Sequence, residues 1–91
     1  MADLDDVLRA LADPTRRELL QSVLRQPGLS TAQLVGSTDG MTRWGVMKHL
    51  AVLRDAGLIL TMAEGRHRRH FPERAALRPL RDWLEEAGAQ T

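Results

Sequence analysis

The stretch MTRWGVMKHLAVLRDAGLI, from Met41 to Ile59, has the residue spacing of an amphipathic helix. Successive residues advance by about 100° around a helix axis, so three aliphatic side chains share one face and predict its buried side: Val46, Leu50 and Leu53. By the same count, the outward side carries Arg43, Trp44, Met47 and Lys48. Two cations beside an outward tryptophan make this side a candidate binding surface.

Capping signals place this helix after a shorter one. Thr42 is a predicted N-cap, and Gly57 supplies the left-handed residue past the C-terminus. Upstream, Ser30 is followed three residues later by Gln33, a capping box that predicts a short helix through Val35. The glycine-bounded run 36–40 between the two helices reads as a turn. This arrangement, over about residues 30–56, predicts a helix-turn-helix.

Two helices are predicted before this motif. A helical apolar face at Leu4, Val7, Leu8 and Leu11, with Asp3 as cap, indicates a short first helix. Asp13-Pro14 is an N-cap followed by proline at the first helical position, and it predicts a second helix that runs to about Gln26.

A hairpin and one more helix are predicted after the motif. The short apolar segment 58–62 and the segment 67–71 flank a polar turn, which indicates a two-stranded wing over about residues 58–71. A last helical stripe comprises Leu77, Leu80, Trp83 and Leu84. Pro79 lies inside that stripe, so the main helix should begin near Arg78 or kink there. The expected fold class is mainly α with a small β-hairpin, a winged helix-turn-helix of about five helices forming one domain over residues 1–91.

Composition limits the function. The 91 residues include no cysteine, which excludes disulfides, thiolate zinc sites and cysteine nucleophiles. The net charge is only +1, but residues 43–74 hold seven basic against three acidic side chains, while both flanking segments are net acidic. No apolar run approaches the roughly 18 residues of a membrane span, and the acidic start is unlike a signal peptide. We expect a cytoplasmic, non-membrane protein.

The concentrated positive charge favours DNA as the partner. Arginine and lysine on the outward side can bond guanine edges or phosphates, while Trp44 and Met47 can contact thymine methyls or sugars. The arginines at the hairpin turn can reach a phosphate backbone or an adjacent minor groove. Amides at the two helix starts can also bond phosphates. The candidate DNA-binding residues are Ser30, Thr31, Thr42, Arg43, Trp44, Met47, Lys48, His49, Arg66, Arg68 and Arg69.

The chain resembles the ArsR/SmtB family of winged-helix bacterial transcriptional repressors. The resemblance is carried by LADPTRRELL (residues 11–20), LSTAQL (29–34), VMKHLAVLRDAGLI (46–59) and EGRHRRHF (64–71). It implies a homodimer whose two recognition helices enter successive major grooves of a palindromic operator and repress by blocking the promoter.

The same resemblance implies dimerisation through the first and last helices, over about residues 3–11 and 73–87. The apolar side chains there exceed what so short a chain is expected to cover alone. The candidate interface residues are Leu4, Val7, Leu8, Leu11, Leu77, Leu80, Trp83 and Leu84. Packing inside the chain is the alternative for these stripes.

The chain departs from metal-sensing members of the family. They use cysteine pairs, or Asp and His ligands in the last helix, whereas LSTAQLVG contains no thiol and LRPLRDWLEE no histidine. His67 and His70, three apart on a strand, should project to opposite faces and so not share one ion. We expect no metal and no cofactor, and no ligand set identifies an inducer.

Three further residues have open interpretations. His49 borders the core face, where a hydrogen bond could anchor the helix, although phosphate contact stays open. Arg16 and Arg17 lie in the first turn of a helix, where a positive charge is mildly unfavourable, so each needs a partner: Asp13, Asp55 or a DNA phosphate.

The chain shows no catalytic pattern. It has no nucleophile beside a base and no phosphate-binding glycine loop, so we expect no enzyme activity. A winged-helix protein-interaction module that uses Trp44 and Met47 without DNA is the alternative function. The basic wing favours DNA, because such a module would not need it.

Overall fold

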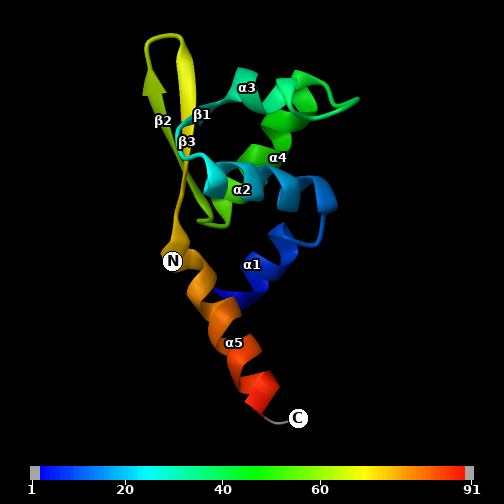
Figure 1. Cartoon of the computed structure of the whole chain (residues 1–91), viewed down its shortest axis with the longest axis vertical. Helices are drawn as coiled ribbons and strands as arrows, with labels where there is room; N and C mark the ends of the chain where they lie inside the picture. Colours follow the sequence, from blue (N-terminus) through cyan, green and yellow to red (C-terminus); the bar gives the residue numbers. More distant parts are fainter. Residues whose placement is uncertain (1–2, 90–91) are drawn as a thin grey trace.

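The computed structural model describes residues 3–89, which form a winged helix-turn-helix. The elements in chain order are α1 (Leu4–Ala10), α2 (Pro14–Arg25), β1 (Leu29–Ser30), α3 (Thr31–Gly36), α4 (Arg43–Asp55), β2 (Ile59–Glu64), β3 (His67–Pro72), the 3-10 turn η1 (Arg74–Leu77) and α5 (Arg78–Ala89). The predicted five helices and hairpin are confirmed. Figure 1 shows the hairpin rising beside α3 and α4, with α5 at the opposite end of the long axis.

The predicted caps begin the helices. Ser30 and Gln33 form the reciprocal capping box, and Thr42 Oγ1 accepts a 3.0 Å hydrogen bond from the Gly45 amide at the start of α4. Gly57 follows α4 with a φ of 77°, in the region that favours glycine. Both helices of the motif therefore begin at a side chain that bonds the backbone.

The core is formed by side chains from both halves of the chain. Val46, Leu50 and Leu53 of α4 are buried against α2 and α3, as their spacing predicts. The other large core side chains are Val7, Leu19, Leu20, Val23, Leu34, Leu58 and Ile59. Val7 was predicted to lie in a dimer interface, but it is 0% exposed within a single chain and fills this core instead.

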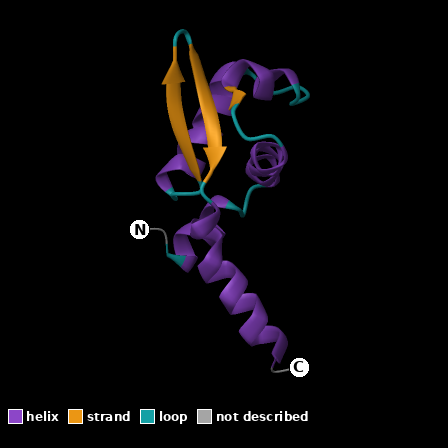
Figure 2. Cartoon of the chain, turned by 60° about the vertical axis from the view of Figure 1, so that its left-hand side comes forward, coloured by secondary structure: helices purple, strands orange, loops and turns teal. Residues whose placement is uncertain are grey.

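A third strand extends the predicted two-stranded wing. β1 pairs antiparallel with β3, so the sheet order is β1-β3-β2, with Leu29 opposite His70 and Ser30 opposite Arg69. Figure 2 shows this short strand leading directly into α3. The helix-turn-helix and the wing are thus joined through one sheet.

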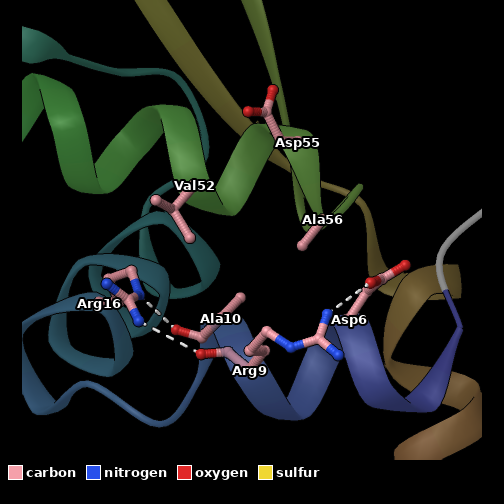
Figure 3. Close-up of a pocket in the computed structure, with 7 residues that line it drawn as sticks. All are labelled: Asp6, Arg9, Ala10, Arg16, Val52, Asp55 and Ala56. Carbon is pink, nitrogen blue, oxygen red and sulfur yellow. Dashed lines mark hydrogen bonds and ion pairs between the residues drawn. The ribbon is translucent and has the colours of Figure 1, made fainter.

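Arg16 and Arg17 bind the C-terminal end of α1. The Arg16 guanidinium donates to the backbone carbonyls of Ala10 and Arg9, at 2.6 and 3.2 Å, as Figure 3 shows. Arg17 donates to the Leu11 carbonyl at 2.7 Å. The expected carboxylate partners were therefore wrong, because the unpaired carbonyls at a helix end accept these charges instead.

Asp13 has a different role at the start of α2. Its carboxylate accepts hydrogen bonds from the backbone amides of Thr15 and Arg16, at 2.8 and 3.2 Å. The bond from Arg16 is the main cause that holds the Asp13 pKa below its usual value. Asp13 therefore caps α2 and does not pair with the Arg16 guanidinium.

α5, the last described helix, packs little against the rest of the chain. None of its residues is buried, and Trp83 is 52% exposed, while Leu77 and Leu80 are partly buried against the core. Pro79 lies in its first turn, where the missing amide costs no hydrogen bond, so the helix begins at Arg78 as predicted. An apolar stripe on α5 is thus available to a partner.

His70 attaches the wing to the helix-turn-helix. Its imidazole is 2% exposed, and its Nε2 and Nδ1 lie 2.8 Å from Thr31 Oγ1 and 3.0 Å from Thr61 Oγ1. Burial, followed by the positive charges of Arg54 and Arg68, lowers the pKa of His70 from its usual 6.5. The buried ring is thus kept neutral at pH 7.

We predict that His70 makes the stability of the fold pH-dependent. Below about pH 6.5 the unfolded chain takes up a proton on His70 before the folded chain does, so stability falls as the pH drops towards the lower, folded pKa. Urea unfolding should show that the free energy of unfolding of the wild type falls between pH 7.5 and pH 5. The fall should be larger than that of His70→Gln between the same two pH values.

His67→Gln is the matched control, because His67 is an exposed histidine of the same strand. It should retain the wild-type dependence on pH. Equal pH dependence in the wild type and His70→Gln would contradict the assignment.

Candidate nucleic-acid interface

The outward side of α4 carries the predicted residues. Trp44 is 69% exposed and Met47 47% exposed, while Arg43 and Lys48 are exposed beside them. The Lys48 ammonium lies 4.4 Å from the centroid of the Trp44 ring, a cation–π contact. The four side chains therefore form one surface, with Trp44 pointing away from the core.

Packing around Gly45 supports the start of this helix. A Cβ added at Gly45 would lie 2.9 Å from Met41 Sδ, closer than side chains tolerate. Met41, partly buried, packs against the core. Glycine therefore allows Met41 to cross the first turn of α4 closely and fix the end that carries Arg43 and Trp44.

The wing separates its three arginines onto two faces. Arg66 and Arg68 are exposed. Arg69 instead lies 3.3 Å from the Glu64 carboxylate and donates to the Gly28 carbonyl at 3.0 Å. Its assignment to DNA is corrected, because side chains alternate along a strand and the one at 69 is used to hold the sheet together.

Ser30 and Thr31 were also predicted to contact DNA, but each is only 5% exposed. The Ser30 hydroxyl caps α3, and the Thr31 hydroxyl bonds His70. Both hydroxyls therefore have structural roles, and the predicted phosphate contact through the backbone amides at the start of α3 stays a prediction.

The histidines divide in the same way. His49 is half-buried, with Nδ1 3.4 Å from Arg16 Nη1, so the predicted anchoring contact between α4 and α2 is present. His67 is exposed whereas His70 is buried on the other face of β3, which confirms that the two project apart. Within residues 3–89, no group of three or more potential ligands is placed to hold a metal ion.

A groove runs between α4 and the wing. One part, of about 140 Å³, is lined by Arg43, Met47, Arg66 and Arg68, among others. The other, of about 400 Å³, has Trp44, Met47 and Ala51 on its apolar side and three cations, Lys48, Arg54 and Arg68. Thr31, Met47 and Arg68 line both parts, so the two parts adjoin.

Arg54 is a groove residue that sequence reasoning missed. It lies eleven residues after Arg43, which on a helix is about 20° away around the axis. The same count that identified Met47 therefore contains the signal for Arg54. Arg54 also lies in the last turn of α4, where a cation suits the helix dipole.

A second cleft, of about 400 Å³, lies between α1 and the C-terminal half of α4 (Figure 3). Its charged side chains are mostly used within the chain: Arg9 pairs with Asp6 at 3.2 Å, and Arg16 bonds the carbonyls of α1. The cationic groove, and not this cleft, is thus the better candidate for an anionic partner.

Comparison with known sequences finds regulators. The chain is 33% identical over 87 residues to the uncharacterized HTH-type transcriptional regulator YuzN of Bacillus subtilis, covering 89% of this chain and 95% of that protein. It is 43% identical over 65 residues to the HTH-type transcriptional regulator CmtR of Mycobacterium tuberculosis. That match covers 68% of this chain but spans only about half, 51%, of CmtR. No protein-family model matches the chain.

Solved structures agree with these sequences. The crystal structure of an ArsR family transcriptional regulator, RHA00566, superposes with a TM-score of 0.85 at 34% identity, covering 99% of this chain and 95% of that one. The NMR structure of CmtR from Mycobacterium tuberculosis, a cadmium metal-sensor, gives a TM-score of 0.65 at 36% identity, with 87% and 80% covered. The similarity therefore extends over nearly the whole winged helix.

Proposed function

Because the chain belongs to the ArsR family of winged helix-turn-helix, DNA-binding transcriptional regulators, we propose that it is a homodimeric repressor of a palindromic operator. The observation that carries the proposal is the cationic surface around Trp44 and Met47. Duplex DNA supplies the matching negative charge, and α4 has the size and position of a major-groove reader. We also propose that it acts in the cytoplasm.

The proposed contacts follow from side-chain chemistry. Arg43 and Lys48 bond base edges or the phosphates beside them, and Trp44 and Met47 contact thymine methyls or sugars. Thr42 and the wing arginines Arg66 and Arg68 bind the backbone or the adjacent minor groove. His49 is held by Arg16, so its contribution to DNA binding is at most one phosphate contact.

Dimerisation is proposed for the apolar faces of α1 and α5. Leu8, Trp83 and Leu84 are each about half exposed, and α5 buries no residue within the chain. A twelve-residue helix is marginal in water without tertiary packing, so a second copy that covers α5 would stabilise it. Leu4, Leu11, Leu77 and Leu80 are partly buried and border the proposed interface.

A protein-interaction module is the weaker proposal for the same surface. Trp44 and Met47 alone would suit an apolar partner, but the groove beside them is lined by Arg54 and Arg68 and by no carboxylate. Apolar protein interfaces are depleted in charge at their centre, which disfavours this alternative.

Regulation of the proposed repressor does not use a thiolate site, since the chain has no cysteine. CmtR is a cadmium metal-sensor, and cadmium is a thiolate-preferring ion. The shared fold therefore does not bring that signal to this chain, and we propose no metal and no inducer for it.

We predict that Arg43→Ala and Lys48→Ala each weaken operator binding by about 1–3 kcal/mol where the residue reads a base. The operator can be selected from fragments of the source genome, and affinities measured by fluorescence anisotropy on it and on single-base variants. Discrimination at the contacted base should fall with the affinity.

Arg25→Ala is the charge-matched control, since Arg25 is exposed in the last turn of α2 and lines neither part of the groove. It should bind like the wild type. Full retention of base discrimination in both α4 variants would remove the proposed contacts.

We predict a mass of two chains in solution at micromolar concentration, measured by light scattering. Trp83→Gln should weaken the dimer by about 2 kcal/mol or more, because buried tryptophans dominate interface energies. Met62→Gln, which alters a similarly exposed apolar side chain on the wing, should leave the dimer intact. A wild-type mass of one chain would contradict dimerisation through α5.

A further inference from the structure

The groove between α4 and the wing has more positive charge than base reading requires. Its larger part is lined by Lys48, Arg54 and Arg68, and its smaller part adds Arg43 and Arg66. No aspartate or glutamate lines either part. The groove is therefore complementary to a chain of negative charges along its whole length.

Arg54 and Arg68 are free to bind a ligand. Both are exposed, and among residues 3–89 neither has a hydrogen bond or ion pair with another side chain or carbonyl. Several other arginines are occupied, among them Arg16 and Arg17 on α1 carbonyls and Arg69 on Glu64.

The geometry of duplex DNA determines what would enter this groove. A recognition helix fills a major groove, and a wing reaches the minor groove next to it. These two grooves are separated by one sugar–phosphate strand. The strand must therefore pass between α4 and the wing, which is the space that this groove occupies.

The lining suits both parts of such a strand. Met47, Ala51 and the Trp44 ring give apolar contact for deoxyribose, and the cations at the edges face phosphates. Arg54 comes from the far end of α4 and Arg68 from β3, so the two approach the groove from opposite walls. Guanidinium groups bind phosphate oxygens with paired hydrogen bonds, which makes two facing arginines an effective clamp.

We propose that Arg54 and Arg68 clamp one sugar–phosphate strand of the DNA in the groove between α4 and the wing. This proposal rests on the proposed DNA-binding function and adds a contact that reads no base. Its effect is to hold a duplex of either sequence against α4 and the wing. Arg54 is thus a backbone-contact residue that adds affinity without reading a base.

Salt dependence and backbone substitution test the clamp together. Affinity for a selected operator duplex and for a mixed-sequence duplex of equal length is measured against salt for the wild type, Arg54→Ala and Arg68→Ala. Each variant should bind both duplexes more weakly by a similar factor, leaving their ratio unchanged. The slope of log affinity against log salt should become shallower by about 0.9 per lost phosphate contact.

A second arm locates the phosphates. Single neutral methylphosphonates are placed in turn along the operator backbone. A methylphosphonate at one or two positions between the major-groove and minor-groove contacts should weaken wild-type binding. The same methylphosphonate should have no further effect on the variant that lacks the arginine bound to that phosphate. Arg25→Ala, on α2 and outside the groove, should keep the wild-type slope and pattern.

The outcomes separate the two proposals. A wild type that binds no duplex would overturn the function itself. A wild type that binds duplex DNA with a steep salt slope, while Arg54→Ala keeps that slope and the same methylphosphonate pattern, would overturn the clamp alone. If Arg54→Ala changed the preference for the operator over the mixed-sequence duplex, Arg54 would be a base-reading residue. That outcome would also count against the clamp.

Discussion

The burial of one face of α4 is the constraint on which the rest of the molecule depends. Val46, Leu50 and Leu53 fill the core against α2 and α3, and this fixes the rotation of the helix about its axis. Because this rotation is fixed, the opposite face of α4 is exposed to solvent, and it carries Arg43, Trp44 and Met47. Each of the two core leucines would cost about 2–5 kcal/mol if truncated to alanine, so together with Val46 they outweigh what burying one tryptophan would gain. The core therefore determines the binding surface.

A second set of interactions places the wing beside that surface. β1 joins the start of α3 to β3. The buried His70 of β3 forms hydrogen bonds with Thr31 of α3 and Thr61 of β2. Arg69 adds a bond to the Gly28 carbonyl. Arg68 shares the face of β3 that carries His70 and, with Arg66 at the turn, borders α4, whereas Arg69 projects to the opposite face. The groove between helix and wing is thus a consequence of how the wing is attached.

Much of this could be predicted from the sequence, and the reasons for the exceptions are physical. Helix boundaries followed from local signals, the Ser30–Gln33 capping box and the Thr42 cap, which involve residues close in sequence. β1 is two residues long, too short for any periodic pattern. Arg69 and Thr31 were misassigned because their partners, Gly28 and His70, are about forty residues away in sequence. Charge spacing predicted where cations cluster, but only tertiary contacts determined which of them are free.

The most direct test of the central claim measures whether Trp44 is exposed to solvent in the free protein and becomes protected when DNA binds. Trp83→Phe leaves Trp44 as the only tryptophan of the chain, so its fluorescence can be followed alone. Light scattering on this variant must first give the wild-type mass, because Trp83 lies in the proposed dimer interface. Acrylamide should quench this fluorescence strongly in the free protein, and addition of the selected operator duplex should protect it. Weak quenching without DNA would contradict the account, because it would mean that Trp44 is buried in the free protein. Strong quenching that persists in the saturated complex would also contradict it, because Trp44 would then not be covered by DNA.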